Sequence, residues 1–245
     1  LSQKDAAKIA RHLVSKFGED ACKRHPLLIK VNAKDGRQAW WTIAAAADGI
    51  IFPAFNQAGQ LLGFQLRKDS PKGHNDRYIW LSHDGLGGTP LTTFQAVPDA
   101  VSAHVVIITE GYKKAALAGE VWACHTISLA GVSAYKEMEV IREIEALNSS
   151  MVVLAFDQDK RQNPAVQRAE TRLRNLVAAT LPETSLFILN WDSEKGKGLD
   201  DAYLAGAEFS FDPAENDGKR YSTDLPGEAH TRAFGTFKPY YTLCL

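Results

Sequence analysis

Cysteine is scarce in this sequence, and long hydrophobic runs are missing. The 245 residues include 3 cysteines, Cys22, Cys124 and Cys244, and no two of them form a Cys-x-x-Cys pair. This spacing argues against a disulfide framework and against a cysteine-rich zinc site. No uncharged apolar stretch reaches the ~18 residues of a membrane-spanning helix, and no basic-then-apolar signal segment opens the sequence. We therefore expect no membrane span, no secretion and a reducing, cytoplasmic setting.

Several catalytic motifs are also missing. No two of the 7 histidines stand at metal-ligand spacing, so we expect no zinc site. The glycines at 85, 87 and 88 do not lead into a Lys-Ser/Thr pair, which excludes a P-loop. No Gly-x-Ser-x-Gly sequence occurs either, so the nucleophile turn of a serine hydrolase is not expected.

Charge is balanced overall but uneven along the chain. The formal net charge is −1, with +4 in residues 1–100 and −5 in residues 101–245. A mildly basic first part beside an acidic second part suits a phosphate-binding surface next to a metal-binding one. With 45% hydrophobic and 23% charged residues, the composition is that of a folded globular protein.

Residues 1–102 are expected to form a small, basic α+β subdomain. Apolar residues recur at helical spacing over residues 4–17, which predicts an amphipathic helix. Short runs typical of strands then follow at 28–31, 39–43, 49–55, 61–67 and 78–81. The sequence 56–59 between two of these runs predicts a hairpin turn.

From residue 103, strand and helix patterns alternate. The expected strands are 105–109, 121–129, 151–156 and 185–189, and the expected helices are 112–119, 134–147, 164–180 and 199–204. This alternation predicts an α/β domain over residues 103–206, with a mostly parallel four-stranded sheet flanked by helices. Residues 207–245, rich in Gly, Pro and Asp, are assigned to a C-terminal extension.

Acidic residues follow three of the expected strands. Glu110 comes directly after the first, Asp157 and Asp159 after the third, and Asp200 and Asp201 after the fourth. Because the carboxyl ends of parallel strands share one sheet edge, these carboxylates are expected to converge there. Such hard oxygen ligands suit Mg²⁺ or Mn²⁺. The alternative for the Asp-x-Asp pair is a solvated turn after a strand.

Basic and aromatic residues gather in the first subdomain, at Arg67, Lys68, Lys72, Arg77, Tyr78 and Trp80. Basic side chains interleaved with aromatic ones suit single-stranded nucleic acid, through phosphate pairing and base stacking. The alternative is a solvated loop ahead of a half-buried strand. Near the acids, Lys113, Lys114 and Lys160 are candidates to balance the acidic charge or to hold a nucleotide triphosphate.

Two segments carry a resemblance to a known family. Thr109-Glu110-Gly111-Tyr112, followed by Ala155-Phe156-Asp157-Gln158-Asp159, resembles the Toprim domain of bacterial-type primases, type IA and type II topoisomerases and some nucleases. Residues 48–67 and 78–91 resemble the subdomain that precedes this domain in bacterial primases. The narrower match is to uncharacterised Toprim-like domains of phage, plasmid and other mobile-element replication proteins.

The resemblance implies roles for individual residues. Glu110 would act as general acid/base or as a metal-linked carboxylate, Asp157 and Asp159 would hold Mg²⁺ or Mn²⁺, and Asp201 or Asp200 would add a further carboxylate. The implied activity is RNA primer synthesis on a single-stranded DNA template from ribonucleoside triphosphates, beside a replicative helicase.

One residue departs from the family pattern. Primases commonly carry an acid four residues after the motif glutamate, where this chain has Lys114. Two alternatives to primer synthesis stay open: a Toprim nuclease that uses the same acids for hydrolysis, and a non-catalytic nucleic-acid-binding module of a mobile-element replication protein.

Overall fold

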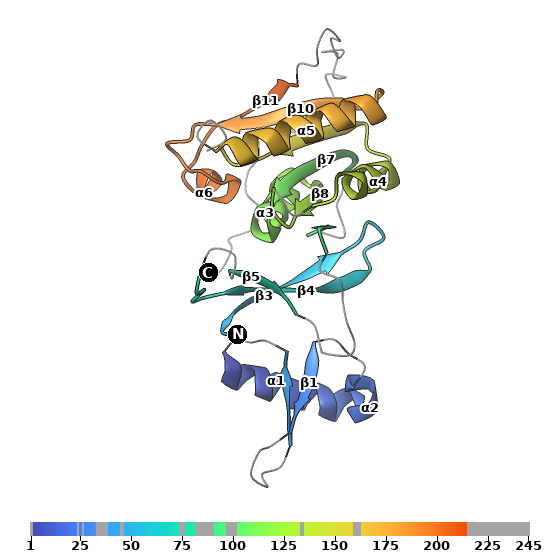
Figure 1. The fold of residues 1–245 in the computed structure, drawn as a ribbon, viewed down its shortest axis with the longest axis vertical. Coiled ribbons are helices and arrows are strands. Elements are labelled where there is room, and N and C mark those ends of the chain that lie inside the picture. The colour runs from blue at the N-terminus through green and yellow to red at the C-terminus, as the bar shows by residue number, and fades with distance from the viewer. Residues whose placement is uncertain are drawn as a thin grey trace. The chain divides into compact units, whose positions relative to one another are not determined.

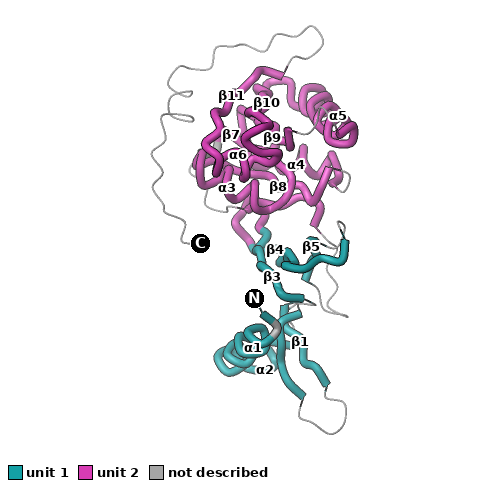
Figure 2. Tube along the Cα trace, turned by 90° about the vertical axis from the view of Figure 1, so that its left-hand side faces the viewer, with its two compact units in different colours: residues 1–54, 61–90 teal, residues 55–60, 91–245 magenta. Residues whose placement is uncertain are grey.

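The structure is a computed structural model of the 245-residue chain. It describes residues 2–23, 25, 27–32, 39–44, 47–73, 77–81, 91–96, 102–132, 135–158 and 163–214. The chain forms two compact units (Figure 2): a first unit of residues 1–54 and 61–90, and a second unit of residues 55–60 and 91–245. Each unit has a hydrophobic core of its own.

The first unit combines short helices with two small sheets. Its elements are α1 (Gln3–Phe17), α2 (Glu19–Cys22), β1 (Leu28–Val31), β2 (Trp40–Ile43), β3 (Gly49–Phe55), β4 (Leu61–Lys68) and β5 (Tyr78–Trp80). Strands β1 and β2 form an antiparallel pair, and β3, β4 and β5 form a separate sheet in that order. The hydroxyl of Ser2 caps α1 by accepting a 3.1 Å hydrogen bond from the Asp5 N–H. The core contains Ala6, Ala10, Leu28, Trp41, Ile43, Leu66 and Leu81.

The second unit is built on one large sheet (Figure 1). Its elements are β6 (Thr93–Phe94), β7 (Ser102–Glu110), α3 (Tyr112–Trp122), β8 (Cys124–Leu129), α4 (Glu137–Leu147), β9 (Met151–Ala155), α5 (Pro164–Thr180), β10 (Ser185–Trp191), α6 (Leu199–Leu204) and β11 (Phe209–Pro213). The strand order is β11-β10-β9-β7-β8-β6. The four central strands are parallel to one another, and β11 and β6 pair antiparallel at the two edges.

Helices cover both faces of this sheet. Alternate residues of β7 point to opposite faces, so Val106 and Ile108 join the core under α4 and α5, whereas Val105 and Ile107 join the core under α3 and α6. Burial on both faces explains why these strands are nearly continuous apolar runs in the sequence. The mixed α/β architecture with a mostly parallel sheet is therefore confirmed.

Several features of the second unit differ from the expectation. The predicted helix over 134–147 begins only at Glu137, because Lys136 is extended and forms its N-cap. The edge strands β6 and β11 were not predicted, so the sheet has six strands where four were expected. The predicted strand start at residue 121 is wrong, because Val121 and Trp122 complete α3. Ala123 then adopts a left-handed φ of 48°, which ends the helix, and β8 begins at Cys124.

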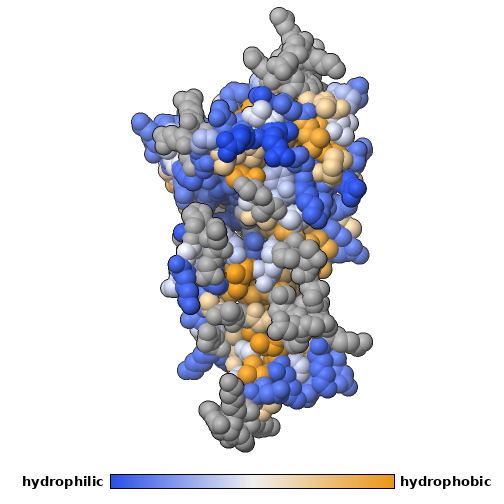
Figure 3. Space-filling model, viewed as in Figure 1, coloured by the Kyte–Doolittle hydropathy of each residue, from blue (hydrophilic) through white to orange (hydrophobic). Residues whose placement is uncertain are grey.

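Hydrophilic and hydrophobic side chains are interspersed on the face shown in Figure 3. Across the part of the chain that the structure describes, no helix combines the length and the apolar character needed to cross a membrane.

Candidate active site

Two neighbouring strands bring acidic residues to the same edge of the large sheet. Strands β7 and β9 are parallel and adjacent, with Thr109 opposite Ala155, so Glu110 and Asp157 both follow at their carboxyl ends. The buried Thr109 hydroxyl donates a 2.8 Å hydrogen bond to the Ala155 carbonyl oxygen, which ties the two strand ends together. Gly111 then turns the chain into α3 with a φ of +77°, a conformation that glycine adopts without strain.

Glu110 is mostly buried and incompletely paired. Its Oε1 atom is buried and has no hydrogen-bond partner among the described residues. Burial raises the pKa of the Glu110 carboxyl, and the negative charge of Asp157 raises it further, while the charge of Lys114 and a hydrogen bond from the Asp157 backbone partly offset these effects. The carboxyl therefore keeps its proton to a higher pH than an exposed glutamate, which suits a general acid or base.

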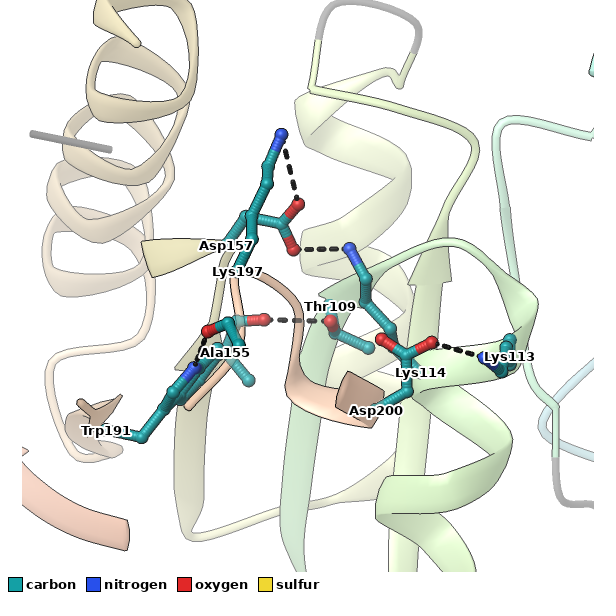
Figure 4. A network of polar contacts seen from close by, with 9 residues as sticks. Thr109, Lys113, Lys114, Ala155, Asp157, Trp191, Lys197 and Asp200 are labelled. Carbon is teal, nitrogen blue, oxygen red and sulfur yellow. Dashed lines mark hydrogen bonds and ion pairs between the residues drawn. The ribbon is translucent and has the colours of Figure 1, made fainter. Parts of the chain in front are cut away.

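Asp157 lies between two lysines (Figure 4). Its side chain is only 11% exposed, and its Oδ1 atom is in direct contact with the ammonium of Lys114, which comes from the first turn of α3. Its Oδ2 atom lies 3.8 Å from the Nζ atom of Lys197. This carboxylate is thus held by the chain's own cations.

A second ion pair lies beside the first. Lys113, adjacent to Lys114 on α3, places its Nζ atom 2.8 Å from Oδ2 of Asp200. Although burial by itself raises the pKa of Asp200, the hydrogen bond and charge of Lys113 lower it below the usual range of an aspartate. Asp200 is buried, whereas the neighbouring Asp201 is exposed on α6. Of the two adjacent acids, the fold therefore brings Asp200 to the lysines.

The loop between β10 and α6 carries Lys197 to this edge of the sheet. Gln158 holds the loop, because its backbone N–H donates to the Lys197 carbonyl oxygen at 3.0 Å and its side-chain amide donates to the Leu189 carbonyl oxygen at 3.2 Å. The Trp191 indole N–H also donates to the Gly196 carbonyl oxygen at 2.8 Å. The position of Lys197 depends on these tertiary contacts, and no sequence pattern pointed to it.

The structure thus assembles part of the predicted constellation. Glu110, Asp157 and Lys114 lie together, and Lys113 lies beside them with Asp200. Asp159 and Lys160 lie outside the described residues. Within the described ranges, no group of three or more His, Cys, Asp or Glu side chains is arranged to hold a metal ion.

The predicted nucleic-acid-binding residues lie in the first unit. In the antiparallel pair of β4 and β5, Arg67 is opposite Tyr78 and Trp80 is opposite Gln65, so these side chains share one face. Arg67, Tyr78 and Trp80 are partly exposed there, and we call these three residues the β4–β5 face. The opposite face of the same strands contributes Leu66 to the core.

The remaining basic residues of this group are spread more widely. Lys68 follows Arg67 on the strand, so its side chain leaves from the opposite face of the sheet. Its backbone N–H donates to the Arg77 carbonyl oxygen at 2.9 Å. Lys72 and Arg77 are exposed beside the two strands. The group is therefore one mixed aromatic and basic face with further basic residues around it.

Part of the chain matches one family model in sequence. Residues 95–208, a little under half of the chain, match a family model described as a domain of unknown function (DUF3854). No curated protein matches the chain in sequence.

Two solved structures are similar in fold. The zinc-binding and RNA polymerase domains of the Aquifex aeolicus primase align with a TM-score of 0.50 at 11% identity, over 85% of this chain and 50% of that chain. The RNA polymerase domain of Mycobacterium tuberculosis primase DnaG, crystallised with double-stranded DNA, aligns with a TM-score of 0.48 at 15% identity, over 73% of this chain and 55% of that chain. The chain thus spans about half the length of each, and its fold is similar to that of the Aquifex aeolicus primase domains.

Proposed function

We propose that this chain is a primase-like nucleotidyltransferase of the Toprim type, which makes short RNA primers on single-stranded DNA with Mg²⁺ or Mn²⁺. The observation that carries the proposal is the pairing of a buried, incompletely bonded Glu110 carboxylate with Asp157 at the ends of two adjacent parallel strands. The primase-like fold supports it. We also propose a cytoplasmic setting and a phage or plasmid origin for this chain.

The two carboxylates fit a divalent ion by the chemistry of their donors. Both offer hard oxygen atoms, and Glu110 Oε1 has an acceptor position that no described group uses. Mg²⁺ is usually held by only one or two protein carboxylates, with water and substrate phosphate completing its coordination. Glu110 and Asp157 would hold the ion, with Asp159 as a further proposed ligand; of the predicted pair Asp200 and Asp201, Asp200 is the acid that the fold brings to the neighbouring lysines. When bound, it would neutralise phosphate charge and lower the pKa of an attacking hydroxyl.

The chain's own residues would act on the attacking hydroxyl and on the incoming triphosphate. In its alternative role, as general acid/base and not as a metal ligand, Glu110 with its raised pKa would exchange a proton with the 3′-hydroxyl at the forming phosphodiester. Lys113 and Lys114 project from the first turn of α3, where the unpaired N–H groups of a helix also favour negative charge. We therefore assign to them the orientation of the triphosphate, and we extend this role to Lys160 from the sequence alone.

The template would bind to the first unit. On the β4–β5 face, the partly exposed rings of Tyr78 and Trp80 offer surfaces for base stacking, and Arg67 offers a phosphate contact beside them. Lys68, Lys72 and Arg77 would add sequence-independent phosphate contacts. A fluorescence anisotropy titration with labelled single-stranded DNA tests this assignment. Trp80→Ala should weaken binding about 5- to 150-fold, the range for loss of one stacked base. Trp40→Ala, which removes an exposed tryptophan of β2, should leave it unchanged.

The activity is tested by primer synthesis on single-stranded DNA with labelled ribonucleotides and Mg²⁺ or Mn²⁺. Wild type is compared with Glu110→Gln and Asp157→Asn, which remove a charge at nearly constant size. Glu120→Gln, an equivalent change at an exposed position of α3, is the matched control. We expect short RNA products from wild type and from the control, and a loss of at least about 100-fold in the two site variants.

The same reactions separate the alternatives. Metal-dependent cutting of the input DNA, with no synthesis and with the same dependence on Glu110 and Asp157, would replace the primase assignment with a nuclease. DNA binding without synthesis or cutting in the full chain would leave a nucleic-acid-binding module.

A further inference from the structure

The acidic edge of the sheet supplies its own positive charge. Around the strand ends, the carboxylates of Glu110, Asp157 and Asp200 interact with the ammonium groups of Lys113, Lys114 and Lys197. Carboxylates that converge repel one another unless a cation joins them. Here the cations are side chains, so the cluster needs no bound ion for its charge balance.

Lys114 is the lysine best placed to act as such a cation. It touches Asp157 directly, and its side chain is only 19% exposed. Its stem passes close to the loop before α6, because a Cβ atom built on Gly198 would lie 2.9 Å from the Lys114 Cε atom. Lys113 and Lys197 are different, since their side chains are 54% and 58% exposed. Lys114 is therefore packed against its partner, while the other two lysines reach theirs from solvent.

Lys114 and a divalent ion would compete for the same oxygen. An ion on Asp157 Oδ1 would stand within a few ångströms of the ammonium, in a place from which water is largely excluded. Like charges at that distance repel strongly when the surroundings screen them poorly. Either the ion binds weakly or the lysine must leave the carboxylate.

We propose that Lys114 is a built-in counter-ion: its ammonium group occupies, on Asp157, the position that a divalent ion would take. It thereby limits both the affinity for divalent ions and the number of them that bind at this site. This inference rests on the proposed function only in treating Glu110 and Asp157 as a cation site. Its test reads ion binding directly, without nucleotide or DNA, so a failure to detect primer synthesis does not affect it.

The experiment measures Mn²⁺ binding to the full chain, by calorimetry and by the electron paramagnetic resonance signal of free Mn²⁺. Lys114→Met keeps the length of the side chain and removes its charge, and we expect it to lower the dissociation constant at least tenfold. Lys114→Glu should lower it further and add a bound ion. Lys114→Arg, which keeps the charge, should resemble wild type. Lys136→Met, which removes an equal charge at an exposed lysine paired with Glu139, is the matched control and should stay within threefold of wild type.

Several results would overturn the inference. One is unchanged affinity and stoichiometry in both Lys114→Met and Lys114→Glu. Another is an equal gain in Lys136→Met, which would indicate a general effect of net charge. A third is a gain that persists when Asp157→Asn is added to Lys114→Met, because the ion would then bind elsewhere. If Lys114→Met folds poorly, Lys114→Glu provides the test through its melting temperature. Mn²⁺ must raise the melting temperature of Lys114→Glu by more than it raises that of wild type.

Discussion

The two lysines that hold Asp157 should contribute very different free energies to folding. Both contact the same carboxylate, but Lys114 is 19% exposed and in direct contact, whereas Lys197 is 58% exposed and 3.8 Å away. Double-mutant cycles of Asp157→Asn with Lys114→Met, and of Asp157→Asn with Lys197→Met, separate the two couplings. Because both lysines contact the same carboxylate, the two coupling free energies can be compared directly.

The magnitudes follow from burial. Removing one partner of a fully buried ion pair costs about 3–5 kcal/mol. Because Asp157 and Lys114 retain a little exposure, we expect a coupling free energy of about 2–3 kcal/mol for this pair. Exposed pairs are worth about 0–1 kcal/mol, and Lys197 should fall in that range.

The assay is urea unfolding at pH 7 with a chelator present, followed by circular dichroism. The surface pair of Lys136 and Glu139, joined at 2.9 Å with side chains 69% and 35% exposed, serves as a control with an expected coupling of about 0–1 kcal/mol. Equal couplings for Lys114 and Lys197, or a Lys114 coupling no larger than that of the control pair, would refute the argument that burial decides the strength of these contacts.

Three further predictions concern other residues. Burial raises the pKa of Glu110 in the folded state above its unfolded value of 4.5, so its contribution to stability is fully present below pH 4.5 and is lost as the pH rises through the folded-state pKa. Glu110→Gln should therefore flatten the decline in unfolding free energy above pH 4.5, measured by urea titrations with a chelator present. An unchanged slope would contradict this. Burial raises the pKa of Cys124 to about 12, so mass-spectrometric mapping should find it alkylated by iodoacetamide only after unfolding. A Cβ atom on Gly49 would lie 2.0 Å from the Arg67 carbonyl oxygen, so Gly49→Ala should lower the unfolding free energy by about 2 kcal/mol or more. Gly63→Ala, whose new Cβ atom would have its nearest contact at 3.9 Å, should lower it clearly less. Equal losses in the two variants would argue against the close approach at Gly49.

Much of the second unit was predictable because its strands are buried on both faces. Continuous apolar runs flanked by helical patterns located the four parallel strands, and the order of those strands placed Glu110 and Asp157 at one edge. The helices 164–180 and 199–204 have the predicted bounds, the first with Asn163 as its cap. These features depend on local pattern, which the sequence carries directly.

The edge strands and the ion pairs could not be obtained in the same way. Strand β6 has only two residues, too few for a periodic pattern. Strand β11 did offer a signal, since Phe209 and Phe211 alternate with polar residues, but the surrounding Gly, Pro and Asp content obscured it. The choice of Asp200 over Asp201 depends on the rotation of α6, and the contact of Lys114 with Asp157 depends on how α3 packs against β7 and β8. Both are set by tertiary packing.

Strand β11 also bears on where this fold can be cut. The family match ends at residue 208, one residue before the strand begins. Phe209 packs edge-on against Trp122 and Trp191, with ring centroids 5.6 Å and 5.8 Å apart, and the backbone N–H of Ala214 donates to the Leu186 carbonyl oxygen at 2.9 Å. A fragment that stops at residue 208 would leave the N–H and C=O groups of β10 open to pairing with another molecule, and would uncover two tryptophans beside them. Such a fragment should self-associate, whereas one that extends through Ala214 keeps this edge closed.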